Sequence, residues 1–212
     1  MKITKLGHCC LIIEINGLRI LTDPGVWTTE QNSIKNIDVV LITHEHSDHL
    51  HIESVKEVLA NNPSAKIYTN SAVGKILAKE GITFNQLEKR EQAEVQGVSL
   101  EAFDGEHGKI YPGVDLPQNT GYFIGGRFFY PGDSLYNPKK EVEALALPVA
   151  GPWIKISEAI DYAIQVRPKK CFPVHDGMLK FFGPFHMLPE KFLGEAGIEF
   201  IPLKPGGEIE FS

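Results

Sequence analysis

The segment IDVVLITHEHSDH at residues 37–49 decides both the fold and the candidate site. Its first six residues are almost uniformly apolar, which predicts a strand that is covered on both faces. At the end of an extended strand, residues two apart project to the same side, so His44 and His46 can bind one ion together. Asp48 and His49 follow where the chain turns into a helix, from where they can reach a second ion. Imidazole and carboxylate suit zinc or a similar divalent metal, so the segment predicts a metal site.

Strands and helices are predicted on both sides of this segment. Apolar runs predict strands at 10–15, 18–21, 66–69, 98–103, 120–124, 127–130, 143–149 and 170–174. Helical spacing predicts helices around 52–59, 73–77 and 159–164, with a short helix near Glu190 and a terminal hairpin at Gly206-Gly207. Meanders mixed with strand–helix–strand units indicate helices packed outside two sheets. No linker interrupts residues 1–212, so we expect a single domain.

The composition excludes several classes of protein. Of 212 residues, 42% are hydrophobic and 23% are charged, which is typical of a globular chain. No apolar stretch approaches the roughly 20 residues that cross a bilayer, and Met1–Leu6 lacks the apolar core of a signal peptide. The net charge of -6 argues against nucleic-acid and anionic-lipid partners. Three cysteines, of which Cys9 and Cys10 are adjacent, argue against a disulfide framework and predict a reducing, cytoplasmic location.

The pattern H-x-H-x-D-H after a buried strand resembles the motif of the metallo-β-lactamase superfamily. This resemblance implies an α/β (α+β) fold, a four-layer αββα sandwich with a dinuclear metal site at one edge. The segment LTDPG at residues 21–25 resembles an early strand end of that superfamily. Gly7-His8, LPVAGPW at 147–153 and PVH at 173–175 resemble a small single-domain branch of metal-dependent hydrolases that includes ascorbate-6-phosphate lactonases. The resemblance covers essentially the whole chain.

The resemblance also implies a set of metal ligands. The first ion would be bound by His44, His46 and His107, and the second by Asp48, His49 and His175, with Asp133 bridging the two. Each of the three residues beyond the motif comes just after an apolar, strand-like run. The two divalent ions would be Zn²⁺ by default, with Mn²⁺ or iron as alternatives. They would lower the pKa of a bridging water from 15.7 to about 7, and the resulting hydroxide would attack the substrate.

Each of these residues also has a structural interpretation. The histidine-rich motif could form a solvated loop, although a strand-to-helix corner is a rigid place to gather donors. His107 could be a loop residue, Asp133 a turn residue or helix cap, and His175 a core histidine. Asp48 and His8 are the candidate catalytic residues, the latter as a substrate contact or a proton donor. Surface, core, turn or substrate-contacting roles are open for His51, Trp153, Lys155, Asp176 and His186.

These observations favour a metal-dependent hydrolase that acts on a small ester, lactone, amide or phosphate. The resemblance places His46 where flavodiiron proteins carry Glu, which points to hydrolytic chemistry. The alternatives are a metal-dependent nuclease, a mononuclear-iron dioxygenase and a non-catalytic metal-binding module. Basic pairs are scattered and small, which disfavours the nuclease. The sequence therefore predicts a small-molecule substrate and no membrane partner, and it predicts no particular oligomeric state.

Overall fold

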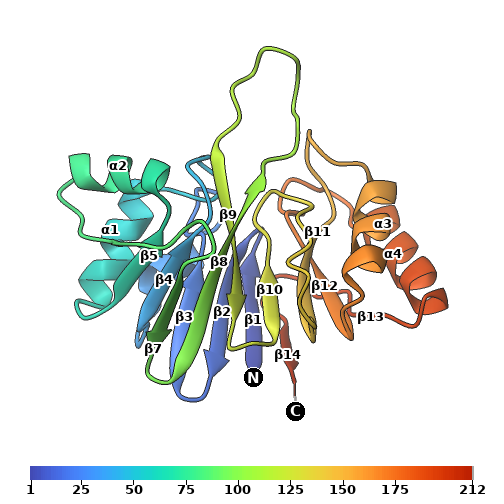
Figure 1. Cartoon of the computed structure of the whole chain (residues 1–212), viewed down its shortest axis with the longest axis horizontal. Helices are drawn as coiled ribbons and strands as arrows, with labels where there is room; N and C mark the ends of the chain where they lie inside the picture. Colours follow the sequence, from blue (N-terminus) through green and yellow to red (C-terminus); the bar gives the residue numbers. More distant parts are fainter. Residues whose placement is uncertain (212) are drawn as a thin grey trace.

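Two seven-stranded sheets lie at the centre of the molecule, and a pair of helices flanks each of them (Figure 1). The computed structural model describes residues 1–211. The first sheet, in the order β14-β1-β2-β3-β4-β5-β6, consists of β1 (Lys2–Gly7), β2 (Cys10–Ile15), β3 (Leu18–Thr22), β4 (Val39–Ile42), β5 (Lys66–Thr69), β6 (Asn85–Gln86) and β14 (Glu208–Glu210). The second, in the order β13-β12-β11-β10-β9-β8-β7, consists of β7 (Gln92–Val95), β8 (Val98–Glu106), β9 (Gln118–Ile124), β10 (Phe128–Tyr130), β11 (Ala144–Pro148), β12 (Lys170–Val174) and β13 (Glu199–Phe200).

The helices form the two outer layers. α1 (Ile52–Asn61) and α2 (Ser71–Lys79) pack on the first sheet, and α3 (Ile156–Val166) and α4 (Gly183–Glu195) pack on the second (Figure 1). A short 3₁₀ turn, η1 (Glu30–Ser33), lies in the loop after β3. This arrangement confirms the predicted four-layer αββα sandwich.

Three apolar layers hold the sandwich together. In β2, Leu11 and Ile13 face the core between the sheets, whereas Cys10 and Ile12 face the core beneath α1 and α2. A third apolar cluster joins the second sheet to α3 and α4. Alternate residues of a strand point to opposite faces, and here both faces are covered, which explains why the central strands read as almost continuous apolar runs.

The parallel strands decide where the candidate site forms. β3, β4 and β5 are parallel neighbours in the first sheet, as are β10, β11 and β12 in the second. Parallel strands have their carboxyl ends at the same edge of a sheet, and ligand sites of open α/β sheets form at that edge. The β8–β9 loop projects from this end of the molecule, at the top of Figure 1.

Two predicted elements at the end of the chain differ from the structure. The helix near Glu190 is longer than predicted, because α4 continues through Pro189. This proline removes one backbone hydrogen bond, and burial of Pro189 and Leu193 against the sheet compensates. The predicted terminal hairpin is wrong: β14 pairs antiparallel with β1, with Ile209 opposite Ile3. Both isoleucines belong to the core between the sheets, so β14 completes that core rather than folding back on its neighbour.

Within residues 1–211, no helix combines the length and apolarity needed to cross a membrane. The expectation that residues 1–212 form one domain stays a prediction, and Ser212 lies outside the described residues. The core between the sheets, to which both sheets contribute, supports that prediction.

Candidate metal centre

The first group of candidate ligands combines the end of β4 with the second sheet. One donor atom each of His44, His46, His107 and Asp133 lies within 4.8 Å of the others. The ring centroids of His46 and His107 are 4.8 Å apart, and the Nε2 atom of His107 lies 3.4 Å from Oδ2 of Asp133. The structure thus brings together the three residues predicted for the first ion and the predicted bridging carboxylate.

The second group lies directly beside the first. His49 and His175 share a cluster with His8 and Cys9, again with donor atoms within 4.8 Å of one another. The Oδ2 atom of Asp48 lies 3.5 Å from Nε2 of His175 and 3.8 Å from Nε2 of His49. The residues predicted for the second ion are therefore adjacent, and the cluster contains a cysteine that was not predicted as a ligand.

Asp133 lies between the two groups. Its Oδ1 atom is 3.1 Å from Nε2 of His49, and its Oδ2 atom is 2.9 Å from Nε2 of His175 and 3.4 Å from Nε2 of His107. Its backbone N–H donates to Oδ1 of Asn119 at 2.9 Å, which fixes the turn after β10. The preceding Gly132 has φ +64, and a Cβ there would lie 2.3 Å from the same oxygen, so this turn requires glycine. The carboxylate is thereby held where it can contact both groups.

Three of the imidazoles are oriented by a partner of the outer nitrogen. The Nδ1 atom of His49 lies 2.7 Å from Oδ2 of Asp23, and that of His175 lies 2.7 Å from the carbonyl oxygen of Ala150. The Nδ1 atom of His107 likewise lies 2.7 Å from a backbone carbonyl oxygen. These contacts leave Nε2 to face the centre, which is the arrangement expected of metal-binding histidines.

Asp23 contacts the centre directly, and sequence reasoning assigned it no role. It is completely buried, and it also accepts hydrogen bonds from the backbone and the hydroxyl of Thr43 and from the hydroxyl of Tyr130. It ties the end of β3 to the segment after β4 and orients His49 at the same time. The LTDPG segment that contains Asp23 was recognised in the sequence. Its partner His49 lies 26 residues away, however, and only the fold brings the two residues together.

The donor set fits divalent metal ions. Four buried atoms have no hydrogen-bond partner outside the two ligand groups in the described part of the chain: Nε2 of His49, His107 and His175, and Oδ1 of Asp133. A buried polar atom without a partner costs about 1–3 kcal/mol, so four at one point need a ligand that satisfies all of them. Neutral imidazole and carboxylate are ligands of zinc and similar ions.

The electrostatics of the centre favour the ionised form of the Asp133 carboxylate beside the imidazoles. Burial raises the pKa of Asp133, but His49 and His175 hold it well below its usual range. In return, Asp133 raises the pKa values of both histidines above their usual range, against burial, which lowers them. For His44, burial and the neighbouring imidazoles lower the pKa. Mutual shifts of this kind in a buried cluster are typical of functional sites.

The β1–β2 turn brings two further side chains to the centre. His8 has φ +38, which is unusual for a residue with a side chain, and its Nδ1 accepts the backbone N–H of Gly177 at 3.2 Å. Its Nε2 therefore carries the hydrogen and faces Oδ2 of Asp48 at 3.2 Å. Burial raises the pKa of the Cys9 thiol, but the charges of His8 and His49 together with that of His175 lower it to about 6.

The remaining candidates lie at different distances from the centre. Trp153 is buried, and its ring centroid lies 5.7 Å from that of His107 and 5.6 Å from that of His175. Lys155 is the N-cap of α3, where its backbone N–H donates to Oε2 of Glu158, and His51 contacts the hydroxyl of Ser54; neither belongs to either ligand group.

A buried network lies behind His175. His186 contacts Oδ2 of Asp176 at 3.0 Å, and the same carboxylate pairs with Lys5, whose side chain is completely buried. Sequence reasoning missed Lys5, because its partner lies 171 residues away. The Lys5 ammonium also donates to the carbonyl oxygen of Pro173, so it fixes the end of β12 from which His175 projects.

The matching family model is described as a beta-lactamase superfamily domain, and it covers residues 2–175, from β1 to the histidine that ends β12. The chain belongs to the beta-lactamase superfamily. A relative within this superfamily is protein Rv0786c of Mycobacterium tuberculosis, 32% identical over 184 residues that cover 84% of this chain and 85% of the relative. Another is the UPF0173 metal-dependent hydrolase Ta0764 of Thermoplasma acidophilum, 24% identical over 93% of this chain and 91% of the relative.

Among solved structures of the beta-lactamase superfamily fold, the chain is similar to Igni18, a novel metallo hydrolase from Ignicoccus hospitalis. The TM-score is 0.77 and the identity 20%, with 100% of this chain and 99% of the other covered. At this identity the likeness shows the shared fold. The predicted link to the ascorbate-6-phosphate lactonase-like branch of the superfamily stays a prediction.

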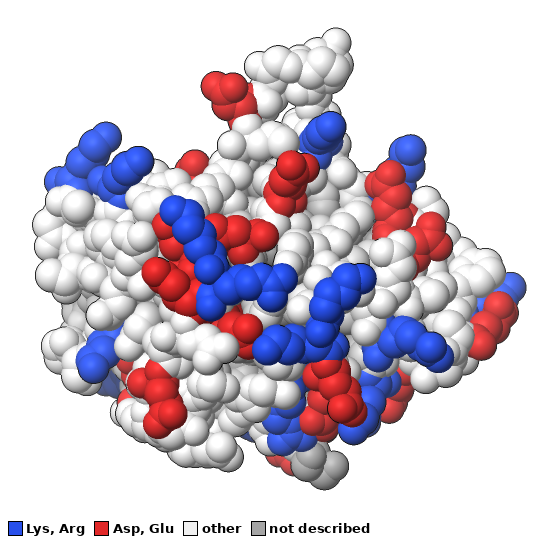
Figure 2. Space-filling model, in the orientation of Figure 1, with Lys and Arg blue, Asp and Glu red and all other residues white. Residues whose placement is uncertain are grey.

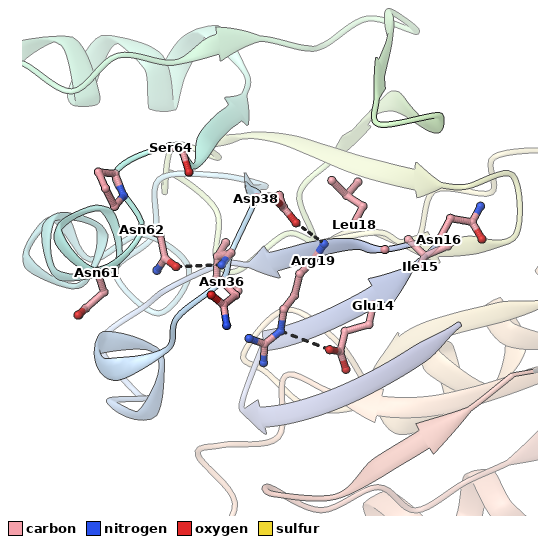
Figure 3. A pocket seen from close by; sticks show the side chains of 13 residues that line it. Glu14, Ile15, Asn16, Leu18, Arg19, Asn36, Asp38, Asn61, Asn62 and Ser64 are labelled. Carbon is pink, nitrogen blue, oxygen red and sulfur yellow. Dashed lines mark hydrogen bonds and ion pairs between the residues drawn. The ribbon is translucent and has the colours of Figure 1, made fainter.

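A separate cavity of about 680 Å³ lies at the opposite end of the first sheet (Figure 3). Its polar side chains bond mainly to neighbouring parts of the chain: Nε of Arg19 lies 3.5 Å from Oε1 of Glu14, and Oδ2 of Asp38 accepts the backbone N–H of Arg19. Asp38 precedes β4, whereas the metal-ligand candidates follow it. These bonds hold the β2–β3 hairpin to the start of β4, so we interpret the cavity as structural.

Proposed function

We propose that the chain is a metal-dependent hydrolase that binds two divalent ions, one in each ligand group, with Asp133 between them. The observation that carries this proposal is the convergence of buried imidazole nitrogens and a carboxylate that, in the described residues, have no hydrogen-bond partner outside the two ligand groups. Family membership and the names of the relatives support the hydrolase, and the His and Asp ligands support Zn²⁺, with Mn²⁺ or iron as alternatives.

Two bound ions would supply an activated water at neutral pH and polarise a carbonyl or phosphoryl oxygen. The chain's own residues set the geometry for this chemistry. Asp133 contacts the imidazoles of both His49 and His175. Asp23 holds the ring of His49 in one orientation, and a backbone carbonyl does the same for the ring of His175. The Nε2–H of His8 holds the carboxylate of Asp48 beside His175. Trp153 packs against His107 and His175 and excludes water from that side.

The loops around the centre support a small-molecule substrate. Trp27 is 48% exposed, and its ring centroid lies 4.5 Å from that of His8, so an apolar surface borders the ligand groups. On the face shown in Figure 2 a short row of basic side chains is bordered by acidic ones, and the net charge of -6 disfavours a nuclease. We propose a small ester, lactone, amide or phosphate as the substrate, and the cytoplasmic location predicted from cysteine usage stays a prediction.

Metal content and turnover test this proposal together. Protein without a histidine tag would be analysed for metals by mass spectrometry and assayed with lactone, phosphodiester and thioester substrates. We expect close to two zinc or manganese ions per chain and hydrolysis of at least one class. A single iron per chain would overturn the proposal in favour of a dioxygenase. A metal-free protein, or a loaded protein without hydrolysis, would overturn it in favour of a binding role.

His8 gives a second prediction, because its Nε2–H positions Asp48. His8→Leu removes this donor and should weaken the second ion or lower kcat by about 10–100-fold, the usual cost of losing a group that orients a metal ligand. His8→Gln retains an N–H near the same place, so this variant should keep most of the affinity for the second ion and most of kcat. Chelator competition and steady-state kinetics would measure the two effects. Equal losses in both variants would contradict the positioning role.

A further inference from the structure

Cys9 is the one cysteine of the chain that lies among metal-ligand candidates. Its side chain is 2% exposed, and its Sγ belongs to the cluster in which the donor atoms of His8, His49 and His175 lie within 4.8 Å. Within the described residues the three cysteines form no disulfide. Cys9 lies at the edge of the apolar layer between the sheets, whereas Cys10 and Cys171 lie in the apolar layers beneath the two helix pairs, away from the ligand groups.

The other members of the cluster leave Cys9 as an available donor. Both nitrogens of His8 are already engaged, Nδ1 by the N–H of Gly177 and Nε2 by Asp48. The Nδ1 atom of His49 is engaged by Asp23. In contrast, Nε2 of His49 and Nε2 of His175 are buried and, within residues 1–211, have no hydrogen-bond partner outside the two ligand groups. The atoms that remain for a metal ion are these two nitrogens and the sulfur.

The spacing of these atoms suits a zinc ion. Zinc lies about 2.0–2.1 Å from imidazole nitrogen and about 2.3 Å from cysteine sulfur, so its ligand atoms are roughly 3.5 Å apart. Donor atoms within 4.8 Å of one another reach that spacing by small side-chain rotations. The carboxylates of Asp133 and Asp48 lie 2.9 and 3.5 Å from Nε2 of His175, so both remain available to the same ion.

The backbone of the β1–β2 turn holds Cys9 beside the second ligand group. Residues 8 and 9 form the short connection between β1 and β2, and His8 adopts φ +38 there. Glycine or asparagine would suit such a turn with less strain. The turn is held in place by the N–H of His175, which donates to the carbonyl oxygen of His8 at 3.2 Å. This contact fixes the β1–β2 turn against a member of the second ligand group.

We propose that Cys9 Sγ is a ligand of the second metal ion, which makes that site a cysteine–histidine–histidine–carboxylate site. This rests on the proposed function for the presence of the second ion. A thiolate is a softer ligand than a carboxylate, so the second site should select zinc over manganese, while the first site, with its histidines and carboxylate, accepts either.

X-ray absorption at the zinc edge tests the proposal on the wild-type protein. We expect a sulfur scatterer at about 2.3 Å from about half of the zinc in protein that holds two ions. Two bound zinc ions with turnover and only nitrogen and oxygen scatterers would overturn the cysteine ligand and leave the hydrolase standing. Absence of bound zinc would overturn the proposed function as well, so the two failures are distinguishable.

Cobalt-substituted variants provide a matched control. The wild-type and Cys10→Ser proteins should both show a thiolate-to-cobalt charge-transfer band, because Cys10 faces the opposite side of the sheet. Cys9→Ser should lose the band and bind the second ion at least about 10-fold more weakly in chelator competition, with the first ion unchanged. A band that survives in Cys9→Ser would overturn the proposal. If that variant fails to fold, the wild-type absorption spectrum still decides.

Discussion

Asp133→Ala is expected to abolish hydrolysis, with a loss of more than about 10³-fold in kcat/KM. Asp133 is the carboxylate that contacts both ligand groups, at 3.1 Å from Nε2 of His49 and 2.9 Å from Nε2 of His175. Without it the centre loses the group that balances two close positive charges, so at least one ion should be lost. Loss of that ion removes the charge that would lower the pKa of a bound water from 15.7 to about 7.

The control for this variant is Asp161→Ala, which changes an exposed aspartate on α3. It should retain the wild-type metal content and turnover. Circular dichroism should show that Asp133→Ala still folds, because Asp133 belongs to none of the three apolar layers. Wild-type turnover with two ions in Asp133→Ala would show that this carboxylate is not part of the centre.

Gly25→Ala is expected to destabilise the protein by about 3 kcal/mol and to disturb the second ligand group. A Cβ on Gly25 would lie 1.9 Å from the carbonyl oxygen of Asp48 and 2.7 Å from the backbone nitrogen of His49. No rotamer change relieves a clash between backbone segments, so one of the two loops has to move. Denaturant unfolding would give the loss of stability, and metal analysis should show weaker retention of the second ion.

Gly194→Ala is the matched control for Gly25→Ala. Gly194 lies within α4, is exposed, and has no heavy atom within 4 Å of an added Cβ. Alanine is the better helix former, so this variant should gain about 0.5–1 kcal/mol and leave metal binding unchanged. If both variants unfold at the wild-type denaturant concentration, the contact between the loops after β3 and β4 is not as tight as the structure indicates.

The local sequence pattern was sufficient to predict the central strands and the first two metal-ligand candidates, His44 and His46. The apolar run at 37–42 predicted β4, and the two-residue spacing of His44 and His46 placed both on one side. His107, Asp133 and His175 were reached through family resemblance, because each follows a different strand and no local spacing connects them. The structure brings them together because the ends of these strands meet at one edge.

The residues that were missed depend on contacts between distant parts of the chain. Asp23 lies in a recognisable segment, but its role needs His49 beside it, and the partner of Lys5, Asp176, follows β12 of the other sheet. From the sequence alone, Cys9 argued only against a disulfide framework, because its position beside His175 depends on where the fold places the end of β12. The sequence also gave no local sign that β14 pairs with β1, because pairing strands that far apart leaves no turn motif.

The pairing of β1 with β14 has a consequence for synthesis on the ribosome. Thr4 and Glu208 are hydrogen-bonded across 204 residues, so β1 leaves the ribosome long before its edge partner exists. For most of that interval β1, which ends just before His8 and Cys9, has only β2 beside it, and His175 has not yet been translated to hold the turn between the two strands. The metal centre is therefore assembled late in translation, from parts made at its beginning, middle and end.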